Sequence, residues 1–167
     1  TLGIIGAGHI GSQVARVAVA NGYDVVIANS RGPETLADLV ADERRLAAIT
    51  VMVDSLEALD LIDSFVGPDH RPIRVCLDVD SSLRILGAHL GAHRSPVHTT
   101  RQTKQIASQI AARRGFDLVG LMFYDAQIAG MPDSGPAIKV VKSRSAAELR
   151  RRRKRIVKAV SQLTNLE

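Results

Sequence analysis

Short apolar runs alternate along the chain with longer segments in which apolar residues recur every three or four positions. The short runs occupy residues 2–5, 24–28, 49–53, 72–77 and 117–123, and each predicts a β-strand. The longer segments between and after them are amphipathic and predict helices. Strands that alternate with helices in this way predict an α/β protein with a mostly parallel sheet.

Capping residues indicate where several helices begin. Ser55 precedes one amphipathic segment and Thr99 or Thr100 precedes another, and each can accept hydrogen bonds from the first free amide groups of a helix. After a long loop with a short extended piece at 138–141, Ser145 is expected to cap a final helix over 146–163.

Two architectures fit five strand–helix units: an open doubly wound sheet, or part of an eight-stranded barrel. Five units cannot close such a barrel, because strand number and shear are linked. We therefore predict one α/β domain over residues 1–167, with an open doubly wound, mostly parallel, five-stranded Rossmann-like sheet that is not a closed barrel.

The first strand runs directly into a glycine-rich turn. Residues 2–11 read Leu-Gly-Ile-Ile-Gly-Ala-Gly-His-Ile-Gly, a Gly-x-Gly-x-x-Gly pattern between a strand and a helix. Gly6 allows the tight turn, Gly8 lets a diphosphate approach the backbone, and Gly11 allows close packing of helix on strand. The helix start offers free amide groups and a positive dipole end to phosphates.

The end of the second strand bears on cofactor choice. NAD-binding folds place an acidic residue there to bind the ribose 2′-hydroxyl, but this chain has Asn29, Ser30 and Arg31. A hydroxyl and a guanidinium suit a 2′-phosphate, so we expect NADP rather than NAD. The alternative is that Ser30 and Arg31 are ordinary loop residues.

Residues 3–36, including Asn-Ser-Arg-Gly-Pro-Glu-Thr-Leu at 29–36, resemble the start of the NADP oxidoreductases that use the deazaflavin coenzyme. The resemblance implies a diphosphate bound at the glycine turn and an adenosine phosphate held by Ser30 and Arg31. His9 could donate to a phosphate or simply face solvent. The expected cofactor-binding residues are Gly6, Gly8, His9, Ile10, Gly11, Asn29, Ser30 and Arg31.

From residue 46 onward the chain is similar to an interior portion of the alanine-racemase-like barrel of pyridoxal-phosphate (PLP) amino acid deaminases and aldolases. The matching pieces are residues 53–57, 75–80, 91–97 and 118–130. That family needs a lysine on its first barrel strand and a glycine-rich phosphate loop, and both are missing here. Only Arg94 carries over, so we do not expect PLP as a cofactor.

The two resemblances meet near residues 41–48, at the boundary between predicted elements. The simplest account is a chimeric or engineered protein that joins strand–helix units of two folds in one sheet. The alternative is a misassembled natural gene.

Composition bears on the location of the protein and on its assembly. The one cysteine, Cys76, lies in an apolar run and excludes an internal disulfide, which suits a reducing, cytoplasmic location. No apolar run approaches the roughly 18 residues of a membrane span, and the sequence starts without a charged leader. An open edge strand could support a homodimer.

Other candidate sites are weak. His89 and His93 would share a face only in a helix that the neighbouring glycines oppose, so no metal site is expected. The basic run 150–155 wraps all sides of a helix without aromatic partners, so we do not expect a nucleic-acid partner. Asp78 and Asp80 are expected to hold a loop or cap a helix.

The function that the sequence favours is NADP(H) binding without complete catalytic machinery. One alternative is an oxidoreductase that passes hydride between NADPH and a flavin or deazaflavin. Another is a PLP-dependent enzyme fragment, and a third is a designed fold that binds nothing. No substrate is indicated.

Overall fold

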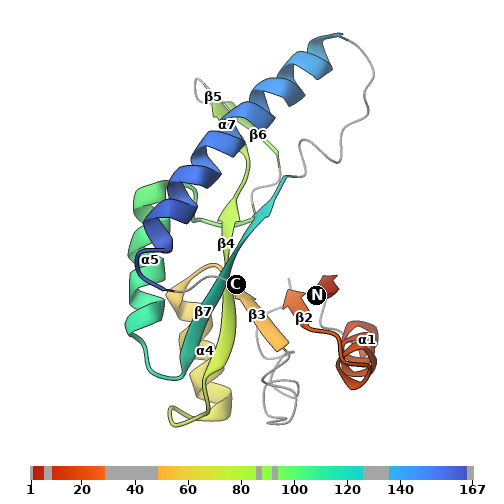
Figure 1. The fold of residues 1–167 in the computed structure, drawn as a ribbon, viewed down its shortest axis with the longest axis vertical. Coiled ribbons are helices and arrows are strands. Elements are labelled where there is room, and N and C mark those ends of the chain that lie inside the picture. The colour runs from red at the N-terminus through yellow and green to blue at the C-terminus, as the bar shows by residue number, and fades with distance from the viewer. Residues whose placement is uncertain are drawn as a thin grey trace.

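The computed structural model describes residues 2–5, 9–28, 49–85, 88–91, 94–125 and 136–164. Figure 1 shows strands and helices alternating along this part of the chain. The strands are β1 (Leu2–Ile5), β2 (Val25–Ala28), β3 (Ile49–Val53), β4 (Ile73–Asp80), β5 (Leu83–Ile85), β6 (Ala88–Leu90) and β7 (Phe116–Tyr124). The helices are α1 (His9–Ala20), α4 (Leu56–Val66), α5 (Thr100–Ala112) and α7 (Pro136–Val160).

Five strands form one parallel sheet in the order β1-β2-β3-β4-β7. β1 and β7 are its two edges, so the sheet does not close on itself. The predicted α/β class and open five-stranded parallel sheet are confirmed. The strand order follows the chain without a reversal, whereas in a doubly wound sheet the order reverses and creates a crevice at that point.

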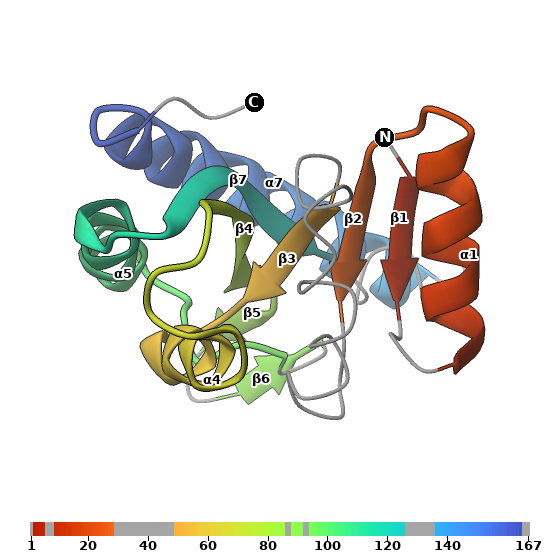
Figure 2. The ribbon, with the colours of Figure 1, turned by 90° about the horizontal axis from the view of Figure 1, so that it is seen from below.

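The described helices pack on one face of this sheet (Figure 2). Ala15 and Ala18 of α1, Leu59 of α4, Ile110 of α5 and Ile156 of α7 all belong to one buried cluster with the strands. A doubly wound sheet carries helices on both faces. The structure therefore differs from that expectation in the placement of its described helices as well as in its strand order.

Side chains alternate between the two faces of the sheet. On β4, Val75 and Leu77 are fully buried against the helices, whereas Cys76 and Asp78 face the other side. The register between β4 and β7 shifts after Val75, so that Gly120 lies opposite Cys76. A Cβ atom at Gly120 would lie 3.4 Å from Cys76 Sγ, so the glycine leaves room for the sulfur.

Local helix signals are confirmed for two helices. Ser55 caps α4, its hydroxyl accepting from the amide of Ala58. Thr99 caps α5 in a full capping box with Gln102.

The carboxyl-terminal helix differs from the prediction. α7 begins at Pro136, so the extended piece expected at 138–141 is wrong, and Ser145 lies inside the helix, where it is buried. The short antiparallel pair β5–β6, against which α7 packs, was not foreseen. In α1, Val14 and Val17 are exposed, whereas Ala15 and Ala18 face the sheet.

Candidate functional site

The predicted nucleotide site lies where β1 leads into α1. Gly6 and Gly8, together with Asn29, Ser30 and Arg31, fall outside the described residues. The last three residues of the predicted diphosphate site, His9, Ile10 and Gly11, form the first turn of α1. The structure therefore places a helix start directly after the predicted turn.

No acidic side chain offsets the positive end of the α1 helix dipole, because the first turn contains none that would neutralise the free amide groups. β1 and β2 are parallel, and Ile5 at the end of β1 pairs with Ala28 at the end of β2. Asn29, Ser30 and Arg31 therefore follow a strand whose carboxyl end lies beside the carboxyl end of β1.

A hollow of about 130 Å³ lies on the face of the sheet opposite the helices. It combines apolar strand residues with one guanidinium and one phenol. Its lining is Gly3, Ile4, Val26, Met52, Arg94, Met122 and Tyr124. Ligand pockets for drug-sized molecules are typically about 300–1,000 Å³, so this hollow could take only a fragment of a ligand.

Arg94 is held at this hollow by two contacts. Its guanidinium carbon lies 4.8 Å from the centre of the Tyr124 ring, and its Nε lies 3.6 Å from Asp78 Oδ2. Burial raises the pKa of Asp78, while the nearby Arg94 acts in the opposite direction. Burial, together with the charge of Asp78, raises the pKa of Cys76 to about 12. The thiol is therefore protonated at neutral pH and is a poor nucleophile.

Asp80 holds the turn that follows β4. Its Oδ1 accepts from the amide of Ser82 at 3.0 Å, and its Oδ2 accepts from the Ser82 hydroxyl at 2.7 Å and from Arg84 at 2.9 Å. Burial acts to raise the pKa of Asp80, but the hydrogen bonds from Ser82 and Arg84 outweigh it and lower the pKa. The predicted loop-holding role is confirmed for this residue.

Arg152 of α7 is buried, and its contacts were not predicted from the sequence. Its Nη1 donates to the main-chain oxygens of Asp80 and His98, and its Nη2 donates to that of Ser82. Glu148 accepts from its Nε at 2.9 Å. The side chain is 5% exposed and joins α7 to the end of β4. Its position on the apolar stripe of α7 was the available signal.

His98 completes this cluster. Its Nδ1 lies 2.9 Å from Arg152 Nη1 and 3.2 Å from the main-chain oxygen of Asp80. Burial lowers the pKa of His98, and Arg152 and Arg84 lower it further. The imidazole is thus neutral near pH 7, and the cluster links elements rather than activating a nucleophile.

Within the described ranges, no three His, Cys, Asp or Glu side chains gather as a metal site would require. His89 lies in strand β6 rather than in a helix, and His93 falls outside the described residues. Among the described helices, none has the length and apolar character needed to cross a membrane.

Comparison with known families matches part of the chain. The family described as NADP oxidoreductase, coenzyme F420-dependent, matches residues 1–64. This stretch covers β1, α1, β2, β3 and most of α4, and it extends beyond the predicted join at 41–48. No curated protein matches the chain.

Two solved structures are similar in chain path. PipY of Synechococcus elongatus PCC7942, determined with PLP bound, aligns with a TM-score of 0.48 at 15% identity, covering 99% of this chain and 78% of PipY. Alanine racemase from Corynebacterium glutamicum aligns with a TM-score of 0.42 at 19% identity, covering 91% of this chain and 45% of the racemase.

Proposed function

We propose that this protein binds NADP(H) at the turn between β1 and α1. The observation that carries the proposal is the helix start at His9, directly after the glycine-rich segment that follows β1, within the region that matches the NADP oxidoreductase family. A diphosphate at this position would accept hydrogen bonds from the free amide groups of the first turn of α1. The absence of an acid in that turn supports an anionic ligand.

Ser30 and Arg31 select NADP over NAD in this proposal. They follow β2, whose carboxyl end lies beside that of β1 in the sheet. A guanidinium binds a phosphate through charge-assisted hydrogen bonds that a free 2′-hydroxyl cannot match. The specificity therefore comes from the loop after β2, and the shared diphosphate affinity comes from α1.

We further propose that catalytic machinery for hydride transfer is incomplete. The hollow of about 130 Å³ beside Arg94 is too small for a nicotinamide ring together with a second cofactor. Cys76 is held protonated, the Asp80 carboxylate is bonded to Ser82 and Arg84, and His98 contacts Arg152 of α7. The alternative of hydride transfer predicts oxidation of NADPH by flavin or deazaflavin acceptors, which absorbance at the NADPH band measures directly. We also propose that the chain is a chimera of two folds, which would account for its two resemblances.

Cofactor titration tests the binding proposal. We expect NADPH fluorescence to saturate on addition of the full chain, and NADH to bind at least about tenfold more weakly, because it lacks the 2′-phosphate. Arg31→Ala should weaken NADPH and leave NADH nearly unchanged. The exposed Arg101 on α5 supplies the control, since Arg101→Ala removes the same charge elsewhere. Failure of both cofactors to bind rejects the site, and equal binding of both rejects the role of Arg31.

A further inference from the structure

Positive charge is concentrated on one helix. α7 contains ten Lys and Arg residues and a single acid, Glu148, for a net charge of +9. The totals of 22 basic and 17 acidic residues leave twelve basic and sixteen acidic residues elsewhere, a net charge of −4. The chain as a whole is therefore polarised, with a basic helix on an acidic body.

The packing of α7 separates its apolar and basic sides. Positions at helical spacing are buried against the rest of the protein, and the basic side chains around them face outward. The buried positions are Ser145, Leu149, Arg152, Ile156 and Val160. The exposed basic residues are Lys139, Arg144, Arg150, Arg151, Arg153, Lys154, Arg155 and Lys158.

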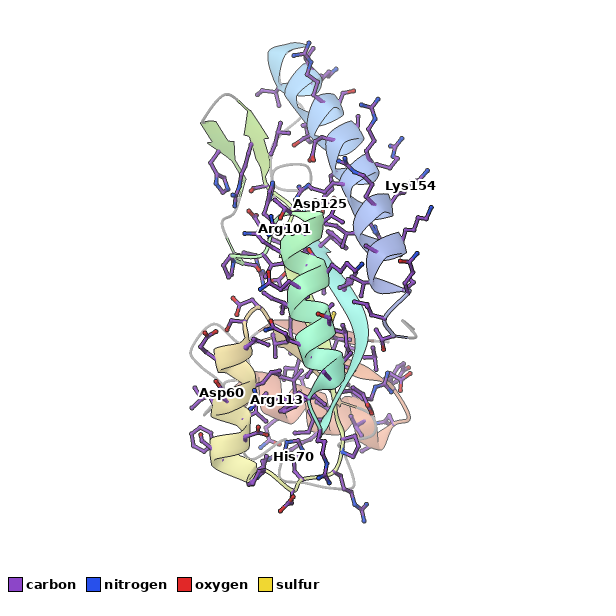
Figure 3. The ribbon with its side chains drawn as sticks, turned by 90° about the vertical axis from the view of Figure 1, so that its left-hand side faces the viewer. Asp60, His70, Arg101, Arg113, Asp125 and Lys154 are labelled. Atoms are coloured by element: carbon purple, nitrogen blue, oxygen red, sulfur yellow. The ribbon has the colours of Figure 1, made fainter. Side chains whose placement is uncertain are left out.

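Of the outward cations, Arg153 lies over the ring of Phe123, with its guanidinium carbon 5.6 Å from the ring centre, whereas a row of three others is available to a partner. The one acid of α7, Glu148, is bonded to the buried Arg152. Among the residues that the structure describes, Arg150, Lys154 and Lys158 have no carboxylate within ion-pair distance. Figure 3 shows Lys154 on the side of α7 that faces away from the β5–β6 hairpin.

These three residues form a regular row. Arg150, Lys154 and Lys158 are four residues apart, which places them on one face at intervals of about 6 Å along the helix axis. Arg151 and Arg155 flank the row. A row of fixed cations on a rigid helix suits a partner whose negative charges are closely and regularly spaced.

We propose that the outer face of α7 binds the phosphate backbone of duplex nucleic acid without reading its sequence. Double-stranded DNA carries one charge per roughly 1.7 Å of its axis, and Lys and Arg contacts to phosphates supply most non-specific affinity. A lipid surface fits less well, since membrane-surface helices bury an apolar face in the bilayer. Here the apolar face of α7, with Leu149 and Ile156, is buried in the protein.

The basic run 150–155 was expected to wrap all sides of its helix, which disfavoured a nucleic-acid partner. Arg152 is buried, however, and the other five side chains of the run are exposed. The lack of aromatic residues bears only on stacking against bases. Binding to the backbone of a duplex does not require it.

A salt titration of duplex binding tests the proposal. The probe is a fluorescein-labelled 20-base-pair DNA of random sequence, followed by anisotropy between 50 and 200 mM KCl with the full chain. We expect the triple variant Arg150→Gln, Lys154→Gln, Lys158→Gln to bind at least about tenfold more weakly at 100 mM KCl. The slope of log affinity against log salt should fall by about 2.7, corresponding to three phosphate contacts.

The matched control removes the same charge from another helix surface. Arg101→Gln, Lys104→Gln, Arg114→Gln neutralises three exposed cations on and after α5 and should change the slope by less than about one. Equal losses in the two triple variants would show a net-charge effect and overturn the proposal. So would absence of duplex binding by the parent chain at 50 mM KCl, or sedimentation with phosphatidylserine vesicles without duplex binding. Circular dichroism of both variants checks that α7 remains folded.

Discussion

Nη1 of Arg152 donates a hydrogen bond to the main-chain oxygen of Asp80 at 2.6 Å, across 72 residues of sequence. The bond joins the last helix to the carboxyl end of β4. Because the guanidinium also donates to the main-chain oxygens of Ser82 and His98, one side chain satisfies three acceptors in this region. α7 therefore depends on a polar contact as well as on Ile156 and Val160 for its position.

Replacement of Arg152 should destabilise the fold. Arg152→Met keeps the length of the side chain but leaves three carbonyl acceptors without their donor, and we expect a loss of about 2–4 kcal/mol in the free energy of unfolding. Urea unfolding measures the change. Arg151→Met, at an exposed neighbour, should stay within about 0.5 kcal/mol. Similar losses at both positions would contradict the role of Arg152.

His98 should make the protein sensitive to mild acid. Its pKa is lowered from 6.5, so below that pH the folded chain binds fewer protons at His98 than the unfolded chain. The stability contributed by His98 is complete above about pH 6.5 and is lost as the pH falls through the lowered pKa. His98→Gln should flatten the stability profile between pH 6.5 and 5, measured by urea unfolding. A stability profile as steep in His98→Gln as in the parent chain would refute the assignment.

Cys76 should be unreactive in the folded protein. The thiol is buried and its pKa is raised to about 12, so thiolate is scarce at pH 8. We expect a disulfide reagent such as DTNB to modify Cys76 only at the rate of unfolding, and within seconds in 6 M guanidinium chloride. Rapid modification under native conditions would show that the opposite face of the sheet is open at Cys76.

Gly115 should tolerate alanine less well than Gly67 does. Both have a φ of 84°, so the cost of a left-handed backbone, about 1–2 kcal/mol, is common to both. A Cβ at Gly115 would lie 2.7 Å from His70 Cε1, whereas nothing lies within 4 Å at Gly67. His70 cannot move freely, because it is bonded to Asp63 and packs against Phe116. We expect Gly115→Ala to cost at least about 1 kcal/mol more than Gly67→Ala in thermal or urea unfolding, and equal costs would rule out the clash.

Local signals in the sequence were sufficient for much of the fold. The caps at Ser55 and Thr99 involve partners within three residues, so they could be recognised without tertiary information. The open parallel sheet followed from the alternation of strands and helices. The fifth strand was expected over 117–123 and occupies Phe116–Tyr124.

What could not be predicted depends on distant contacts. Strand order is set by the packing of the whole sheet, so the edge position of β1 left no local signal. An extended piece was predicted at 138–141, but that segment belongs to α7, which packs against β5. Arg152 stands among apolar positions on one face of α7. Its acceptors outside α7 lie 54 to 72 residues earlier in the chain, so no neighbouring residue indicated what it would contact.

The most direct test of the nucleotide site is to observe the main-chain amides of the first turn of α1. In a ¹⁵N-labelled sample titrated with NADPH, we expect saturable shifts of the His9, Ile10 and Gly11 amide resonances. The amides of Thr100 and Arg101, at the start of α5, should stay in place, because that helix start carries no glycine-rich turn. Shifts confined to other parts of the chain, or no shifts at millimolar NADPH, would contradict binding at the turn between β1 and α1.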